Sequence, residues 1–226
     1  MSPNIPLASR IDHTLLRPDC TAAQVTQLCQ EAADHGFASV CVPPCYVAQA
    51  AAQLAGSTVK VGTVIGFPLG YAAASAKFKE AEVALYDGAD ELDMVMNISA
   101  FKSGNFDAVR AEICDLTELC HMQEATLKVI IETALLNEEE ITKAAQLCAE
   151  AEADFVKTST GFASRGASFE DVRLLRKVLP DTVRIKASGS IRSRAAALAM
   201  VEAGADRIGS SNSLALITEE DEPTAA

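Results

Sequence analysis

The stretch AGADRIG, residues 203–209, ends one apparent helix and begins one apparent strand. Similar stretches occur earlier, DHGFASV at 34–40 and DGADELD at 87–93, and EAEADFV at 150–156 is a variant without the glycine. Glycine after a helix accepts the left-handed backbone conformation that terminates the helix, and a strand follows at once. The recurrence indicates a weak internal repeat of a helix-turn-strand unit.

Strand-like and helical patterns alternate along the whole chain. Several of the strand-like segments are continuous apolar runs, which are typical of strands buried on both faces in a parallel sheet. The expected strands are 10–16, 38–44, 59–67, 91–97, 126–133, 154–159, 183–189 and 206–211. Helix starts are marked by pairs that match or approximate a capping box: Thr21 with Gln24, Asn137 with Glu140, and Ser168 with Asp171.

Eight strands, each followed by a helix or by the chain end, predict an α/β fold, a single (β/α)8 TIM barrel over residues 1–217. The acidic segment 218–226 is predicted to be a frayed tail. A doubly wound open sheet is the alternative. Its first βα turn would carry a G-x-G-x-x-G fingerprint, and this sequence has none.

Composition restricts the kinds of partner. The 226 residues carry a formal net charge of −12, which disfavours nucleic acid and anionic membranes but not small anionic substrates. No export signal and no apolar run of membrane-spanning length is present. The seven cysteines are odd in number and include no C-x-x-C pair, which favours reduced thiols in the cytoplasm over a disulfide framework or a metal site.

Charged residues occur where strand ends are expected, and in such a barrel the active site lies at the C-terminal ends of the strands. Lys157 follows the apolar pair 155–156, Lys186 lies in VRIKASG, and Asp93 lies within the apolar strand ELDMVMN. A buried carboxylate is costly unless it is paired, so Asp93 is expected either in a structural ion pair or beside an interior lysine. Nearby positive charge and desolvation lower the pKa of a lysine, and a neutral amine can attack a carbonyl to form a Schiff base. Taken singly, each lysine is equally consistent with a snorkelling side chain or a phosphate contact.

Three short loops of glycine and hydroxyl residues follow the last three strands: TSTG at 158–161, SGS at 188–190 and GSS at 209–211. Small residues let backbone amides approach an anion, and the loops after strands seven and eight are the usual phosphate site of such barrels. Loops of this composition are also ordinary turns.

These motifs together resemble the deoxyribose-phosphate aldolase family of class I aldolases, and the shorter bacterial form is the most similar. The matching stretches run in family order over nearly the whole chain: IDHTLL, ASVCVPP, VGTVIGFPLG, SAKFKEAE, ELDMVMN, LKVIIETALL, DFVKTSTGF, VRIKASGSIR and DRIGSS. The resemblance implies reversible cleavage of 2-deoxy-D-ribose 5-phosphate to D-glyceraldehyde 3-phosphate and acetaldehyde. It also implies a homo-oligomer, a dimer or tetramer, with no metal and no organic cofactor.

The resemblance implies a role for each motif residue. Lys157 would be the Schiff-base nucleophile, Lys186 and Asp93 the proton-transfer pair, and Asp12 the support for Lys186 and the substrate. Thr160 would hold a substrate hydroxyl. The phosphate would be held by Gly161, Gly189, Ser190, Gly209, Ser210 and Ser211.

Four features set this chain apart or add a question. Ser190 stands where the family often has a second glycine, and a positive φ there would strain it. Phe162 stands where longer members have a lysine, so Arg165 or Arg192 is expected to supply the charge. The catalytic C-terminal tyrosine of longer members is absent. Cys41, at the mouth of strand two, is expected to be a packed thiol, with attack by an aldehyde product as the alternative.

Three other functions are consistent with the residues alone. One is a Schiff-base lyase acting on a different sugar or keto-acid phosphate. A second is a phosphate-binding barrel isomerase or synthase that uses no covalent lysine. The third is a non-catalytic sugar-phosphate binder, which would have no need for two interior lysines.

Overall fold

In the computed structural model, which describes residues 6–218, each repeated stretch lies where a helix ends and a strand begins. Gly36 has a φ of 63°, and Gly88 and Gly204 have φ values of 100° and 116°. In the variant stretch without glycine, Glu152 takes the same left-handed conformation with a φ of 55°. The turn is therefore kept even where its preferred residue is missing, because the strand after it is fully buried.

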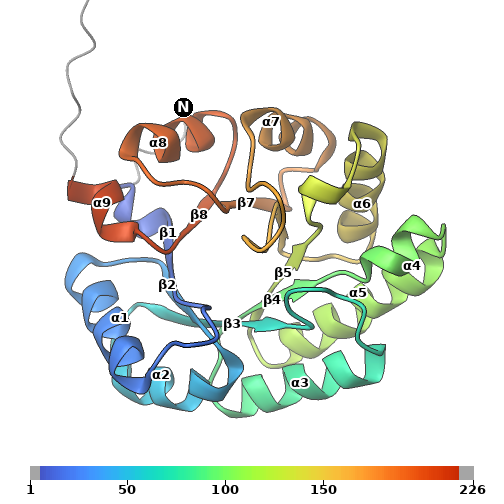
Figure 1. Cartoon of the computed structure of the whole chain (residues 1–226). Coiled ribbons are helices and arrows are strands. Elements are labelled where there is room, and N and C mark those ends of the chain that lie inside the picture. The colour runs from blue at the N-terminus through green and yellow to red at the C-terminus, as the bar shows by residue number, and fades with distance from the viewer. Residues whose placement is uncertain (1–5, 219–226) are drawn as a thin grey trace, which may run out of the picture.

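Within residues 6–218 eight parallel strands form a closed barrel in sequence order, with β1 paired to both β2 and β8 (Figure 1). Every predicted strand is confirmed, and each is shorter than its predicted range. The strands are β1 Ile11–Thr14, β2 Ser39–Val42, β3 Lys60–Ile65, β4 Glu91–Val95, β5 Thr126–Ile130, β6 Phe155–Lys157, β7 Arg184–Ser188 and β8 Arg207–Ser210. Closure of the sheet rules out the doubly wound alternative.

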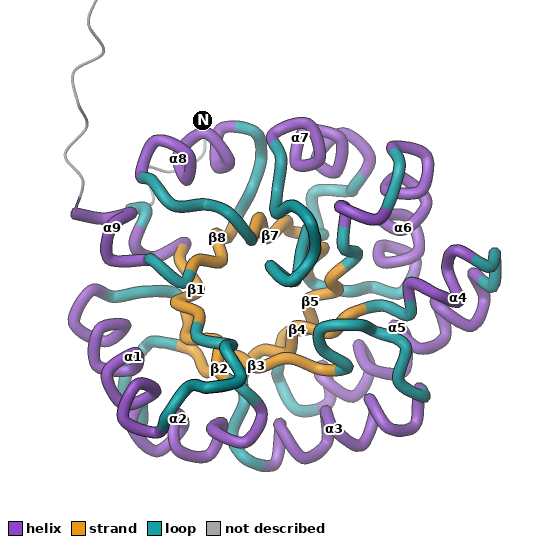
Figure 2. Tube along the Cα trace, viewed as in Figure 1, coloured by secondary structure: helices purple, strands orange, loops and turns teal. Residues whose placement is uncertain are grey.

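Helices surround the ring of strands on all sides (Figure 2). They are α1 Ala22–His35, α2 Val47–Gln53, α3 Ala74–Tyr86, α4 Ile98–Lys102, α5 Phe106–Met122, α6 Glu138–Glu150, α7 Phe169–Val178, α8 Arg194–Glu202 and α9 Ser213–Thr218, with 3-10 turns at Ala8–Arg10, Pro44–Tyr46 and Thr133–Leu135. The capping boxes at Thr21 and Asn137 are confirmed, and Ser168 accepts a hydrogen bond from the Asp171 amide. None of the helices in the described part of the chain is both long and apolar enough to cross a membrane.

The predicted tail, 218–226, lies outside the described residues except for Thr218, which is the last residue of α9. The predicted boundary between barrel and tail therefore stays a prediction.

The two faces of the sheet differ in character. Leu92 and Met94 of β4 belong to the hydrophobic core between strands and helices. Asp93 lies between them and, because strand side chains alternate, faces the barrel axis. The register then brings charged residues together: Asp93 is the ladder partner of Lys128, and Lys157 is that of Lys186. The predicted burial on both faces is confirmed, but the inner face is largely polar.

Candidate active site

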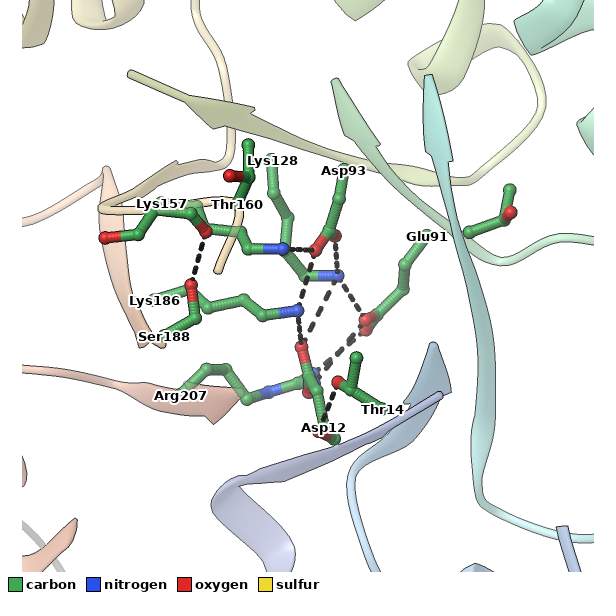
Figure 3. Close-up of polar contacts among 12 residues, drawn as sticks. Asp12, Thr14, Glu91, Asp93, Lys128, Lys157, Thr160, Lys186, Ser188 and Arg207 are labelled. Carbon is green, nitrogen blue, oxygen red and sulfur yellow. Dashed lines mark hydrogen bonds and ion pairs between the residues drawn. The ribbon is translucent and has the colours of Figure 1, made fainter. Parts of the chain in front are cut away.

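The side chains of Lys157 and Lys186, the two lysines that the sequence singled out, both point toward Asp93 (Figure 3). Its Oδ2 accepts hydrogen bonds from Lys157 Nζ at 2.7 Å and from Lys186 Nζ at 2.8 Å. All three residues are at most 3% exposed. The two lysine nitrogens therefore share one carboxylate oxygen inside the barrel, out of bulk water.

Asp12 of β1 holds the second lysine from the other side. Its Oδ2 lies 2.5 Å from Lys186 Nζ, and its Oδ1 accepts from the guanidinium of Arg207 on β8. Lys186 thus has two carboxylate partners, whereas Lys157 has one. This difference separates the electrostatics of the two amines.

The pKa shifts follow from that difference. Burial lowers the pKa of Lys157, the positive charge of Lys186 lowers it further, and Asp93 offsets only part of the effect. Burial would also lower the pKa of Lys186, but Asp12 and Asp93 outweigh it and raise that pKa. Burial favours protonation of Asp93, yet the surrounding lysines hold its pKa well below the usual value. Of the two amines, Lys157 is therefore the one that loses its proton more readily.

A cavity of about 790 Å³ opens above the lysines, and Lys157 lies on its wall. The cavity wall includes every loop residue predicted to bind substrate: Thr160, Gly161, Gly189, Ser190, Gly209, Ser210 and Ser211. Asp12, Asp93 and Lys186 are fully buried beneath it. The amine of Lys157 is thus the point at which the charged cluster meets the cavity.

Ser190 has a φ of 62°, so this serine does adopt the left-handed conformation that strains an L-residue. Gly189, just before it, has a φ of 83°, and a Cβ on Gly166 would lie 2.2 Å from the Gly189 carbonyl oxygen. Two glycine backbones therefore pack against each other directly at the entrance to this loop. The side chain at Ser190 is tolerated at the cost of backbone strain.

Two predicted substrate donors are already engaged by the protein. Thr160 donates its hydroxyl hydrogen to Glu132 Oε2, whose oxygen also accepts from the Thr160 amide at 3.1 Å. Ser210 donates to the Ile191 carbonyl at 3.2 Å and accepts from the Asn212 amide at 3.1 Å. Both hydroxyls shape their loops, so their free contribution to a ligand is as acceptors.

Of the two arginines expected to replace the family's lysine, only Arg192 lines the cavity. Arg165 is paired with Asp171 at 2.5 Å and donates to the Thr133 carbonyl at 3.0 Å. Arg192 is exposed and lines the cavity, as does Phe162. Arg192 is therefore the better placed cation for an anionic ligand.

Cys41 lies on β2, 1% exposed, among the charged residues. Burial raises the pKa of its thiol to about 11, and the negative charge of Asp93 adds to the effect. A protonated, enclosed thiol is a poor nucleophile, which favours the packed-thiol interpretation.

Glu91, Lys128 and Arg207 extend the cluster, and none of them was given a role from the sequence. Lys128 Nζ lies 2.5 Å from Glu91 and 3.0 Å from Asp93, and Arg207 Nη2 lies 2.9 Å from Glu91. For two of them the sequence does contain a signal: Glu91 is two residues before Asp93, and Lys128 interrupts the apolar run TLKVII. Charged residues at alternate strand positions point to the same face. Within residues 6–218 no group of three or more His, Cys, Asp or Glu side chains is placed to hold a metal ion.

A lysine with a lowered pKa on the inner face of a (β/α)8 barrel, at the wall of a cavity with small polar loops, is typical of enzymes that work through an amine. A family model described as DeoC/LacD family aldolase matches residues 7–215, and the chain belongs to this family.

Relatives and solved structures agree with that assignment. The chain is 51% identical over 212 residues to a deoxyribose-phosphate aldolase of Desulfitobacterium hafniense, covering 94% of this chain and 97% of the relative. It is 50% identical to the enzyme of that name from Thermococcus gammatolerans, over 93% of this chain and 95% of the relative. Among solved structures, a tetrameric deoxyribose phosphate aldolase from Aeropyrum pernix superposes with a TM-score of 0.88 at 37% identity, covering 93% of this chain and 89% of the other.

Proposed function

We propose that this protein is a class I aldolase that reversibly cleaves 2-deoxy-D-ribose 5-phosphate to D-glyceraldehyde 3-phosphate and acetaldehyde. The observation that supports the proposal best is the single Asp93 oxygen shared by Lys157 and Lys186. Family membership and the name of the relatives supply the substrate. The arrangement supports Lys157 as the nucleophile and Lys186 as the acid.

In the first step the neutral amine of Lys157 adds to the C1 aldehyde of the open-chain sugar and forms a carbinolamine. The hydroxyl leaves as water with a proton from the Lys186 ammonium, so that Lys157 becomes a positively charged iminium and Lys186 a neutral amine. Asp93 contacts both nitrogens and therefore keeps a positive partner throughout. The charge of the buried cluster does not change during this step, which avoids a large electrostatic penalty.

In the second step the Lys186 amine takes the proton of the 3-hydroxyl, directly or through a water. The C2–C3 bond then breaks, its electrons pass to the iminium, and the products are D-glyceraldehyde 3-phosphate and an enamine on Lys157. The iminium thus replaces an unstable carbanion with a stabilised intermediate. Lys186 next gives that proton to C2 of the enamine, which restores the iminium on Lys157. Water then adds to the iminium and acetaldehyde leaves. Lys186 takes up the proton released in this hydrolysis, so that Lys157 is again a neutral amine.

The phosphate is proposed to lie against the loops after β6, β7 and β8. Gly161, Gly189 and Gly209 have no side chains to block the backbone, and Ser190 and Ser211 add hydroxyls on the same cavity wall. The hydroxyl of Ser210 already donates to the Ile191 carbonyl, so Ser210 is proposed to shape this wall. Arg192 is the proposed cation for the phosphate. Thr160 is proposed to accept a hydrogen bond from a substrate hydroxyl, because its own hydrogen is directed to Glu132.

We also propose a cytoplasmic protein that assembles as a dimer or tetramer. All seven cysteines are free in the structure, as expected in a reducing compartment. The Aeropyrum pernix relative is described as a tetramer. Size-exclusion chromatography with light scattering would measure the assembly directly.

The test is borohydride trapping with 2-deoxyribose 5-phosphate, followed by peptide mass mapping. A reduced adduct is expected on Lys157 and absent from Lys157→Met, while Lys79→Met, a change at an exposed lysine of α3, keeps it. An adduct on Lys186 would exchange the two roles. Turnover without any adduct, or with Lys157→Met still active, would favour an isomerase or synthase on the same barrel.

A further inference from the structure

A second layer of charged side chains, made of Glu91, Lys128 and Arg207, lies next to Asp93 and Asp12 (Figure 3). Lys128 of β5 contacts Glu91 at 2.5 Å and Asp93 at 3.0 Å, and lies 3.8 Å from Asp12. Arg207 of β8 contacts Asp12 and, at 2.9 Å, Glu91. Glu91 and Lys128 do not line the cavity, so the substrate would not touch them.

The charges of the two layers cancel only when Lys157 is neutral. The cluster contains three carboxylates, Asp12, Glu91 and Asp93, and three cations other than Lys157, namely Lys128, Lys186 and Arg207. Each of these carboxylates contacts at least two of the cations. An unbalanced charge in a buried site is strongly unfavourable, so a proton on Lys157 would be the excess one.

We propose that Glu91, Lys128 and Arg207 are positioning residues that balance the charge of the barrel interior and thereby make Lys157 the amine that is free of its proton. This inference rests on the proposed function, since a neutral Lys157 is what the Schiff base requires. It concerns residues that act through Asp12 and Asp93 rather than on the substrate.

The directions of the individual shifts agree with the charge count. Burial would lower the pKa of Lys128 and of Arg207, but their carboxylate partners outweigh burial and raise both values. Lys157 is the one cation of the cluster whose pKa is lowered. The charged or titratable groups around Lys157 come from six other strands. Asp93 of β4, Lys186 of β7 and Cys41 of β2 act on Lys157 directly. Lys128 of β5 contacts Asp93, and Asp12 of β1 contacts Lys186. Glu91 of β4 contacts Lys128, and Arg207 of β8 contacts Asp12.

The test is a measurement of the Lys157 protonation midpoint that does not depend on turnover. Acetic anhydride, a small amine reagent, would label the full-length protein between about pH 5 and 11, and mass mapping would give the labelled fraction at Lys157. Removal of a negative charge by Glu91→Gln should lower the midpoint. Removal of a positive charge by Lys128→Met or Arg207→Met should raise it. Each shift should be about one pH unit, the size expected for a unit charge several ångströms away in a protein interior.

Arg207→Lys is the matched control, because it changes the side chain and keeps the charge. The Lys157 midpoint in Arg207→Lys should stay close to that of the unsubstituted protein. Arg207→Lys keeps the charge and Glu91→Gln is nearly isosteric, so these two variants should fold even if the Met variants do not. Shifts of opposite sign would support charge balance, since a merely structural disturbance would move all variants the same way. Equal or absent shifts in Glu91→Gln and Arg207→Met would overturn it.

Failure of the proposed function would look different. A low Lys157 midpoint that moves as expected, in a protein that forms no adduct with 2-deoxyribose 5-phosphate, would retain the charge balance and reject the substrate. An adduct with 2-deoxyribose 5-phosphate, together with Lys157 midpoints that do not move in the variants, would retain the substrate and reject the charge balance.

Discussion

Ser190 is a single residue whose backbone conformation opposes its side chain. Its φ of 62° is easy for glycine and costs an L-residue about 1–2 kcal/mol. Ser190→Gly should therefore raise the free energy of unfolding by about 1 kcal/mol after the extra entropy of glycine in the unfolded chain is subtracted. Urea unfolding would measure the change. Ser190→Ala keeps the strain and removes only the hydroxyl, so an equal gain there would show that backbone strain is not the cause.

Gly209 has a steric role that its loop composition did not indicate. A Cβ at this position would lie 2.9 Å from Ser188 Cβ and 3.1 Å from Lys186 Cε. Gly209→Ala should displace the Lys186 ammonium from Asp12 and Asp93 and lower kcat by roughly 10- to 100-fold, since small misplacements of catalytic groups are costly. Steady-state kinetics would show it. A kcat for Gly209→Ala equal to that of the unsubstituted protein would contradict the explanation.

At the scale of elements, the loop after β6 is held by Glu132, which lies between β5 and the 3-10 turn Thr133–Leu135. Glu132 has a φ of 54°, is 3% exposed, and accepts from both the amide and the hydroxyl of Thr160. Glu132→Ala should release the TSTG loop and raise KM for the phosphorylated substrate by about tenfold, the equivalent of one charged hydrogen bond. Kinetic assays would test this.

Glu124 offers a matched control for that experiment. It has the same left-handed backbone, with a φ of 55°, but is exposed in the turn before β5. Glu124→Ala should leave KM unchanged. If both variants raised KM alike, the effect would come from the backbone conformation and not from the contact with Thr160.

The elements themselves could be predicted because their signals are local. Helix ends at Gly36, Gly88 and Gly204, and capping boxes at Thr21 and Asn137, are read within a few residues of sequence. Strand ends were overestimated by one to three residues, since an apolar pattern continues past the last ladder hydrogen bond.

The site was predicted less completely, for a different physical reason. Lys157, Lys186 and Asp93 stand out as charges in apolar strands, and the structure brings them together. The partners of Lys128 and Arg207 depend on register across several strands and on closure between β1 and β8, which no local pattern specifies. Likewise, the sequence did not show that the hydroxyls of Thr160 and Ser210 are engaged within the protein.

At the scale of the whole molecule, a second buried ion pair connects the helical shell to the barrel. Lys77 of α3 is 0% exposed, and its Nζ lies 2.9 Å from Glu112 of α5 and donates to the Val95 carbonyl of β4 at 2.8 Å. Burial lowers the pKa of Lys77 and raises that of Glu112, despite the attraction between them. Desolvation therefore outweighs the attraction in both pKa values, and the pair is expected to specify the arrangement of α3 and α5 more than to stabilise it.

This balance predicts strongly non-additive effects. Lys77→Met alone leaves the Glu112 carboxylate buried without its partner and should lower the free energy of unfolding by about 3–5 kcal/mol. Combining it with Glu112→Leu removes both charges and should recover most of that loss, with the unpaired Val95 carbonyl costing about 1–3 kcal/mol. Urea unfolding of the two single variants and the double variant gives the coupling energy between the two charges directly.

Lys79→Met is the control for this experiment. Lys79 lies two residues after Lys77 on α3, but its side chain is 72% exposed, so the substitution should change the free energy of unfolding by less than about 0.5 kcal/mol. A double variant as unstable as the sum of the single variants would show that the two charges act independently and that α3 and α5 are held together by apolar packing alone.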